Sequence, residues 1–148
     1  MTTITALTEA DRDDWLSLWQ AYLTFYESEV ADDVTASTFA RIVDPAGEIQ
    51  GAVARDDDGR AVGIVHWFAH PATWSKTHYT YLEDLFVDPS ARGGGIGRAL
   101  IAHVTDAARA SGSDKVYWLT AETNATARAL YDHVAERSGF IHYQIDLA

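Results

Sequence analysis

The feature that most constrains this 148-residue chain is the run "RGGGIG" at residues 92–97. It stands between the apolar stretch "YLEDLFV" and the amphipathic stretch "IGRALIAHVTDAARASG". Glycine loses more backbone entropy on folding than any other residue, so consecutive glycines are costly unless the backbone needs the room. A glycine-rich turn between a strand and a helix leaves backbone N–H groups free at the positive end of the helix, where a phosphate group can bind. We therefore expect a strand–turn–helix unit that approaches a phosphate-bearing ligand.

The spacing of these glycines distinguishes between kinds of phosphate loop. A dinucleotide fingerprint, G-x-G-x-x-G/A, requires a small residue where Arg98 or Leu100 stands. A P-loop requires a lysine after its last glycine, and none follows here. The pattern R-x-x-G-x-G is present as Arg92, Gly95 and Gly97. A tight turn without a ligand is the alternative that the glycines alone leave open.

Composition narrows the classes of protein. The formal net charge of −11 repels nucleic acid and attracts cations, so we expect no nucleic-acid partner. No apolar run approaches the roughly 20 residues that span a bilayer, and the first residues resemble no signal peptide, so we expect no membrane partner. The absence of cysteine excludes disulfides, thiolate metal sites and a cysteine nucleophile, and is consistent with a cytoplasmic protein.

Hydrophobic periodicity predicts the order of helices and strands. Helices are expected at residues 8–28, 35–45, 96–112 and 124–139. Strands are expected at 48–70, as a hairpin that turns at Asp58-Gly59, and at 77–88, 115–122 and 140–147. No repeat or linker interrupts the chain. We therefore predict a single domain over residues 1–148, of mixed α/β class, with one mixed sheet flanked by helices.

Two segments resemble the GCN5-related N-acetyltransferase (GNAT) superfamily. The stretch "DLFVDPSARGGGIGRALI" is similar to its central cofactor motif, and "VYWLTAETNATARALYDHVAERSGFIHYQIDL" to its second motif. The order of elements before them also matches, so the resemblance covers nearly the whole chain. It implies a mostly antiparallel sheet splayed at the fourth strand. It also implies transfer of an acetyl group from acetyl-CoA to a primary amine, by direct attack in a ternary complex.

The resemblance further implies how acetyl-CoA binds. The pyrophosphate would meet the N–H groups of residues 93–98, while the pantetheine arm would pair with the backbone of the splayed strand and with an asparagine side chain. The plain alternatives are surface positions for the two arginines and a helix start for the asparagine. The expected cofactor-binding residues are Leu85, Phe86, Val87, Arg92, Gly93, Gly94, Gly95, Ile96, Gly97, Arg98, Asn124 and Tyr131.

The chemistry requires a base and an acid. A primary amine with a pKa of about 10.4 is protonated near neutrality and cannot attack a thioester in that state. Glu83 and Asp84 are carboxylates in an apolar strand, where burial is costly unless they are paired or used. Strand alternation puts Glu83 with Tyr81 on one face and Asp84 on the other. The resemblance to polyamine acetyltransferases makes Glu83 the expected base, through water, and Tyr131 the expected acid. A solvated face for Glu83 and a core position for Tyr131 are the alternatives.

The acceptor site is predicted to combine aromatic and acidic side chains, which suit an ammonium group. Its expected members are Tyr22, Tyr26, Trp74, Tyr81 and Glu83. We expect no metal site, because His66 and His70 lack the HExxH pattern and the aspartates at 56–58 lack the glutamate of an EF-hand.

The expected partners are a small-molecule amine and a second copy of the chain. The apolar strand predicted at 140–147 would expose an edge that invites pairing, and relatives of this size are commonly homodimers. A small cationic amine or a polyamine is the predicted acceptor. A non-catalytic acetyl-CoA-binding regulatory module, and acetylation of a protein or amino-acid amine, are the alternatives.

Overall fold

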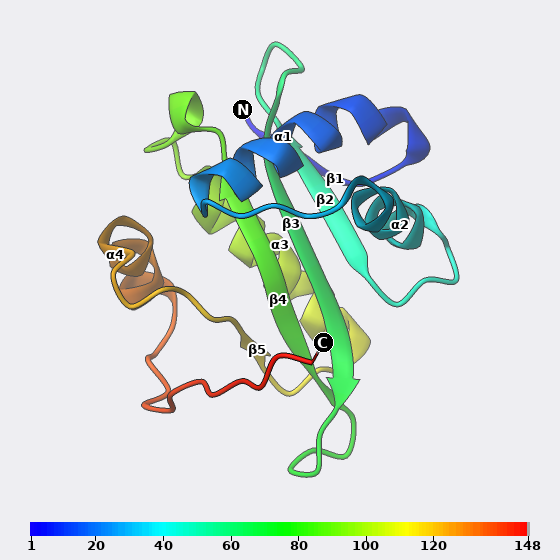
Figure 1. The fold of residues 1–148 in the computed structure, drawn as a ribbon. Helices are drawn as coiled ribbons and strands as arrows, with labels where there is room; N and C mark the ends of the chain where they lie inside the picture. Colours follow the sequence, from blue (N-terminus) through cyan, green and yellow to red (C-terminus); the bar gives the residue numbers. More distant parts are fainter. Residues whose placement is uncertain (148) are drawn as a thin grey trace.

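Five strands form one sheet in the order β1-β2-β3-β4-β5 in the computed structural model, which describes residues 1–147 (Figure 1). The antiparallel strands β1 to β4 are followed by β5, which runs parallel to β4. This confirms the mixed, mostly antiparallel sheet expected from the sequence. The strands are β1 (Thr3–Ala6), β2 (Gln50–Arg55), β3 (Ala61–Pro71), β4 (His78–Val87) and β5 (Val116–Tyr117).

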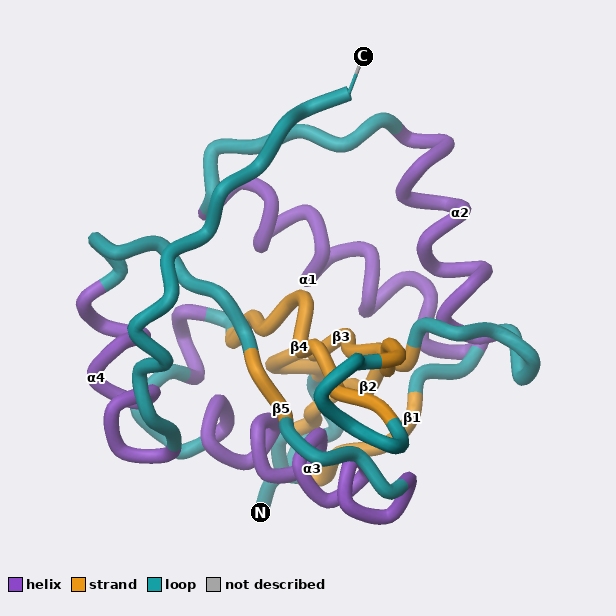
Figure 2. Tube along the Cα trace, turned by 90° about the horizontal axis from the view of Figure 1, so that it is seen from below, coloured by secondary structure: helices purple, strands orange, loops and turns teal. Residues whose placement is uncertain are grey.

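Helices cover both faces of the sheet (Figure 2). One face carries α1 (Arg12–Phe25) and α2 (Asp32–Val43), the other carries α3 (Ile96–Ser111), and α4 (Ala125–Val134) lies at the β5 side. Short 3-10 turns, η1 (Glu9–Asp11) and η2 (Pro89–Ala91), precede α1 and the glycine run. The core has two parts because the sheet separates an aromatic cluster under α1 from an aliphatic cluster under α3. No helix within residues 1–147 is long and apolar enough to cross a bilayer.

The sheet opens at the edge of β4. The pairing of β5 with β4 is limited to Thr80 with Val116 and Tyr81 with Tyr117. Among residues 1–147 no strand pairs with this edge of β4 between Leu82 and Val87. Backbone N–H and C=O groups are therefore left at that edge for another partner.

A β-bulge in β4 changes the face of the sheet on which its side chains lie. His66 lies opposite Asp84, whereas the next residue, Trp67, lies opposite Leu82, so Glu83 is an extra residue without a cross-strand partner. The bulge reverses the alternation predicted from the sequence: Glu83 and Asp84 line the same cavity. Leu82 and Leu85 pack on the opposite side with α3. The predicted placement of the two acids on opposite faces is wrong, because a bulge shifts the side-chain period by one residue.

The ends of the chain depart most from the sequence prediction. The strand expected at 140–147 is wrong: residues 136–147 are in neither helix nor strand and make no hydrogen bond to another element of the described chain. The helix expected to end at residue 139 ends at Val134, and the strand expected at 115–122 is two residues long. Alternating apolar residues favour an extended backbone, but a strand also needs a paired edge. The four-residue β1 was not predicted.

The hairpin between β2 and β3 matches its prediction. Gly59 has φ 81°, and Asp56 Oδ1 accepts from the N–H groups of Asp58 and Arg60. The aspartates at 56–58 therefore lie in a tight turn that the Asp56 side chain stabilises, as Asx side chains commonly do.

Candidate active site

The glycine run folds into a loop whose N–H groups are free. Gly93 and Gly95 have φ of 85° and 81°, in the left-handed region that favours glycine. Gly95 is also the N-cap of α3. Within the described chain, the N–H groups of residues 93–98 donate to no backbone acceptor. Free N–H groups at a helix N-terminus form a binding site for a compact anion.

The glycines differ in what they do. A Cβ on Gly97 would lie 3.2 Å from Leu130 Cδ2, so this glycine lets α3 approach α4. A Cβ on Gly93 or Gly95 would meet nothing within 4 Å, so there the requirement is conformational. The side chain of Ile96 is buried in the core, which leaves only its N–H group for a ligand.

Gly94 provides a steric probe of this loop. Its φ is not in the left-handed region, and a Cβ there would lie an ordinary 3.6 Å from Ala91 O. We expect Gly94→Val to leave the melting temperature unchanged and to raise the Kd for acetyl-CoA at least about tenfold, because the side chain would project from the loop at which the sequence predicts pyrophosphate binding. Calorimetric titration beside the smaller Gly94→Ala checks this. Wild-type affinity in a folded Gly94→Val protein would contradict the placement.

Arg92 and Arg98 bring positive charge to the loop. Arg92 Nε donates to Val87 O at 3.1 Å, and the guanidinium lies 5.1 Å from the ring centre of Phe25 and 5.7 Å from that of Phe86. Arg92 is therefore held between the end of β4 and the end of α1. Arg98 is exposed and forms no ion pair in the part of the chain that the structure covers.

Helix α4 begins after Asn124 and carries Tyr131, which packs against the core cluster under α3. Asn124 Oδ1 accepts from the Ala127 N–H at 3.4 Å, so Asn124 caps the helix, which is the alternative to cofactor binding that the sequence left open. Tyr131 packs against Trp118 with ring centres 5.4 Å apart. Burial, and then the nearby Tyr26, raise the pKa of Tyr131 to about 12. Its hydroxyl has no hydrogen-bond partner among residues 1–147, so it is a protonated donor free to act on a ligand.

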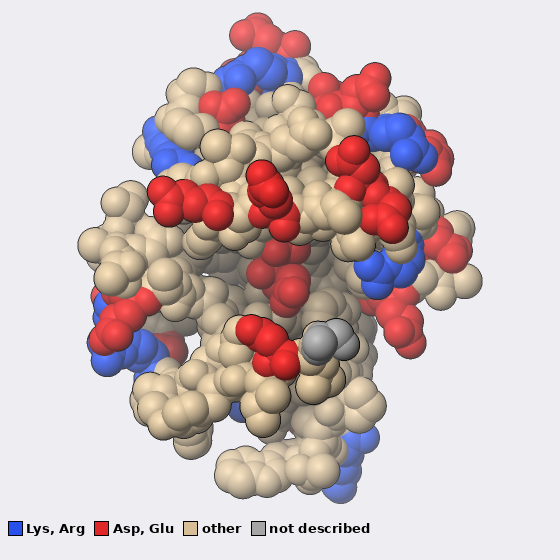
Figure 3. All heavy atoms as spheres, in the orientation of Figure 1, with Lys and Arg blue, Asp and Glu red and all other residues tan. Residues whose placement is uncertain are grey.

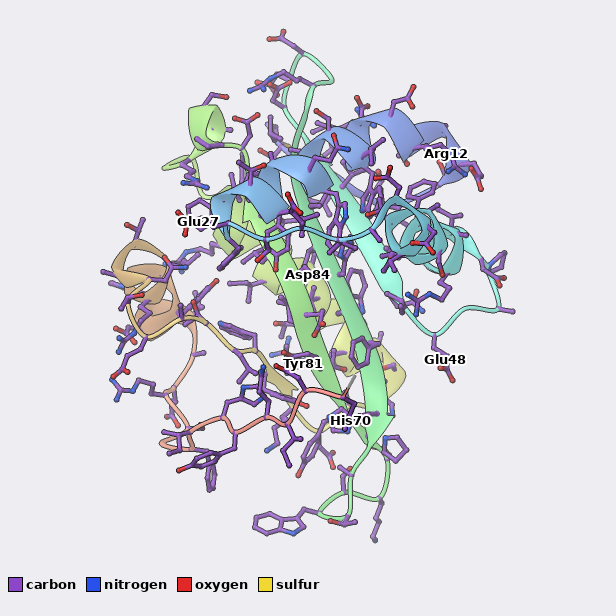
Figure 4. All side chains as sticks on the ribbon, viewed as in Figure 1. Arg12, Glu27, Glu48, His70, Tyr81 and Asp84 are labelled. Atoms are coloured by element: carbon purple, nitrogen blue, oxygen red, sulfur yellow. The ribbon has the colours of Figure 1, made fainter. Side chains whose placement is uncertain are left out.

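A cavity of about 440 Å³ lies between α1, α2 and the sheet. In the orientation that Figures 3 and 4 share, acidic atoms occupy the hollow below α1, where Asp84 is labelled. The lining combines carboxylates, aromatic rings and one guanidinium: Trp19, Thr38, Arg41, Glu48, Ile49, His66, Phe68, Ala69, Glu83 and Asp84. Such a lining suits a small molecule with a positive group and an apolar body.

The carboxyl group of Glu83 has a raised pKa. Partial burial is the main cause and the charge of Asp84 is the second, while the Tyr81 hydroxyl acts in the opposite direction. Burial, and then the charge of Glu83, raise the pKa of Tyr81 to about 12. Glu83 therefore holds a proton more readily than an ordinary carboxylate, which is the property that a base needs near neutrality.

The sequence prediction missed Asp84 as a site residue. Tyr22 donates its hydroxyl to Asp84 Oδ1 at 2.8 Å, and His66 Nδ1 lies 2.9 Å from Asp84 Oδ2. The sequence did contain a signal for Asp84, which is the pair of adjacent carboxylates in an apolar strand. Strand alternation, however, predicted that the two carboxylates would lie on opposite faces of the sheet. Arg41 and Thr38 of α2 carried no signal for this cavity, because only the tertiary fold brings α2 over the sheet.

The predicted aromatic residues divide into two groups. Tyr22 and Tyr81 contact or neighbour the two acids, and Tyr26 lies edge-on to Tyr22 with ring centres 5.1 Å apart. Trp74 is 90 % exposed on the loop between β3 and β4, and like the three tyrosines it is not among the residues that line the cavity. Its loop extends away from the helices (Figure 1).

Comparisons with known proteins agree with this geometry. Over 142 residues the chain is 34 % identical to the D-amino-acid N-acetyltransferase HPA3 of Saccharomyces cerevisiae, which covers 95 % of this chain and 88 % of that protein. The structure of AAC(6')-Iy with the bisubstrate analogue CoA-S-monomethyl-acetylneamine has a TM-score of 0.85 at 18 % identity, covering 100 % of this chain and 99 % of that one. A ribosomal-protein-alanine N-acetyltransferase from Brucella melitensis biovar Abortus 2308 has a TM-score of 0.78 at 22 % identity, covering 99 % and 100 %.

The family assignment rests on the sequence match and agrees with the fold. The model of the acetyltransferase (GNAT) family matches residues 6–135, which include the free N–H loop, both acids and Tyr131. The structural relatives share the fold at low identity. The chain therefore belongs to the GNAT acetyltransferase family and is an N-acetyltransferase.

Proposed function

We propose that the protein transfers the acetyl group of acetyl-CoA to the primary amine of a small molecule, in a ternary complex without an acyl-enzyme. The observation that carries the proposal is that β4 has an unpaired edge, is followed by a loop of free N–H groups, and supplies two carboxylates to a cavity. A loop of this kind suits a pyrophosphate, and the carboxylates suit an ammonium group.

The proposed cofactor path follows the unpaired backbone. The pyrophosphate binds the N–H groups of residues 93–98 beside Arg92 and Arg98, and the pantetheine arm pairs with β4 at residues 85–87. The Asn124 amide, whose Nδ2 makes only a 3.5 Å contact with Thr120 Oγ1, is available to the same arm. This path brings the thioester toward Tyr131.

The proposed reaction needs one proton acceptor and one donor. The substrate ammonium gives a proton to Glu83, directly or through water, and the free amine attacks the thioester carbonyl carbon. The new C–N bond forms, the C–S bond breaks, and Tyr131 protonates the departing thiolate while the nitrogen loses its second proton to solvent. The raised pKa of Glu83 supports its role as base, and Tyr131, with a pKa of about 12, carries the proton that the thiolate needs.

The acceptor is proposed to be a small cationic amine or a polyamine. The acids in the cavity and the net charge of −11 both favour cations. An amino-acid amine is the second candidate, supported by the name of the yeast relative and by Arg41, a cation in the cavity lining that could pair with a carboxylate.

CoA release on mixing the protein and acetyl-CoA with a panel of amines tests this proposal. We expect di- and polyamines to give a higher kcat/KM than acidic amino acids, and their KM to rise with salt because screening weakens attraction to the acids. Preference for an anionic acceptor, unaffected by salt, would contradict the electrostatic argument. Binding of acetyl-CoA without turnover of any amine would instead support a non-catalytic binding module.

A homodimer is proposed on the basis of the C-terminal segment. Phe140, Ile141, Tyr143, Ile145 and Leu147 are between 75 % and 91 % exposed, which is a large apolar stripe for a chain to leave in water. We expect light scattering to give the mass of a dimer at micromolar concentration. Aspartate at both Ile141 and Ile145 should give a monomer, while alanine at His142 and Gln144, on the alternate face, should not. A monomeric wild-type protein would contradict the proposal.

A further inference from the structure

A buried chain of hydrogen bonds joins α1 to the acceptor cavity through β3. Trp15 Nε1 donates to His66 Nε2 at 2.9 Å, and His66 Nδ1 meets Asp84 Oδ2 at the same distance. Trp15 is 1 % exposed and His66 is 2 % exposed, so water does not compete for these bonds. In Figure 4, Asp84 extends from β4 toward α1; Asp84 and His66 are the members of the hydrogen-bond series that line the cavity.

The donors in this series of hydrogen bonds determine which nitrogen of the His66 imidazole carries the proton. An indole nitrogen can only donate, so His66 Nε2 must offer a lone pair to Trp15. The imidazole proton is then on Nδ1, which donates it to Asp84 Oδ2. Asp84 Oδ1 accepts from the Tyr22 hydroxyl at 2.8 Å. A second proton on His66 would collide with the Trp15 N–H and leave a buried donor unsatisfied, which is unfavourable.

The bulge gives the two neighbouring acids different surroundings. His66 and Asp84 are directly opposite in the ladder, which places the imidazole against the carboxylate. Asp84 thus has protein donors on both oxygens, whereas Glu83, the extra residue, has the Tyr81 hydroxyl beside it. The groups that face the imidazole are Asp84 and Glu83 from β4, Trp15 and Trp19 from α1, and Gly51 from β2.

We propose that Trp15 and His66 are positioning residues: they hold the imidazole in its neutral Nδ1–H form, and so fix Asp84 as the carboxylate that receives the ammonium group of the acceptor. Glu83, which lacks these fixed donors, is then left to take the proton. This inference rests on the proposed function only for the identity of the acceptor. The hydrogen-bond chain itself belongs to the free protein.

Nitrogen NMR of the histidine side chains in the free protein tests the chain without any substrate. His66 is assigned as the signal lost in His66→Asn. We expect an Nδ1–H imidazole with an unprotonated, hydrogen-bonded Nε2. In Trp15→Phe the Nε2 signal should move, because its donor is gone and a second proton is no longer excluded. Trp19→Phe is the matched control: Trp19 Nε1 donates to Thr35 Oγ1 and not to His66, so this variant should keep His66 in the Nδ1–H form with an unprotonated Nε2. A proton on Nε2 in the wild-type protein would overturn the proposal.

Kinetics with an accepted amine test the consequence for Asp84. We expect His66→Leu, which has no donor, to raise the KM of the amine on the order of tenfold with the KM of acetyl-CoA unchanged. His66→Asn keeps an N–H donor for Asp84 and should restore much of the loss. A merely structural role would change both KM values alike, and that result, or a wild-type amine KM in a folded His66→Leu protein, would overturn the proposal. If no amine is turned over, the proposed function fails while the NMR result still decides this inference.

Discussion

Replacing Tyr131 by phenylalanine is expected to lower kcat about 100-fold or more while the KM for acetyl-CoA stays nearly unchanged. The ring would still fill its place against Trp118, so only the proton is lost. Because burial raises the pKa of Tyr131 to about 12, the hydroxyl is protonated throughout the neutral range and can serve as the proposed acid. Steady-state kinetics with saturating amine, at several concentrations of acetyl-CoA, measures both constants.

Tyr79→Phe is the matched control for this prediction. Tyr79 lies on β4 near the cation of Lys115, whose Nζ is 4.2 Å from the ring centre, and it does not line the acceptor cavity. The same loss of a hydroxyl should there leave kcat close to the wild-type value. A fully active Tyr131→Phe enzyme would remove Tyr131 from the proposed mechanism and leave its hydroxyl as a feature of the core.

Replacing Glu83 by glutamine is expected to depress kcat/KM for the amine about 100-fold near neutral pH, and by less as the pH rises. At neutral pH nearly all of the amine arrives protonated and needs a base, whereas at high pH more of it arrives uncharged. Because the pKa of Glu83 is raised, the wild-type enzyme should lose activity as the pH is lowered, and the loss should begin at a higher pH than it would with an ordinary carboxylate as the base. A pH profile of the variant parallel to that of the wild type would exclude Glu83 as the base.

The same substitution has an opposite expected effect on stability. Because the folded-state pKa of Glu83 is raised, its ionised form costs stability above that pKa and costs nothing below the unfolded value, where both states are protonated. Glu83→Gln should therefore melt at the wild-type temperature or higher at neutral pH, with no gain in acid. Thermal unfolding at both pH values would then separate a catalytic loss from a folding defect.

The sequence predicted those features that depend on local pattern. The glycine loop, its arginine and the helix that follows them are predicted by backbone freedom and by a 3.6-residue period, and the structure places them as expected. The mixed sheet followed from the order of elements. The facing of Glu83 and Asp84 could not be predicted in the same way, because the bulge that reverses it is set by pairing with β3, a contact between distant residues.

The end of the chain shows the same limit in another form. Residues 141–147 alternate apolar and polar side chains as a strand does, but in the structure they form no strand and remain exposed. Alternation specifies a preference for a pleated backbone, but pairing requires an available edge, which the pattern itself cannot supply. The acceptor cavity was likewise predicted only in part. Glu83 of β4 was expected there, but the α2 residues that line it were not, because only the tertiary fold brings α2 over the sheet.

One strand offers its edge to the proposed cofactor and its face to the proposed acceptor. The edge of β4 beyond Tyr81 presents main-chain groups, which are the same whatever residues the strand carries. The face presents Glu83 and Asp84, which a single codon can change. Substrate choice can therefore drift by point mutation while the donor of the acetyl group is kept, so duplicated copies of such a gene can diverge toward new amines without first losing their common chemistry.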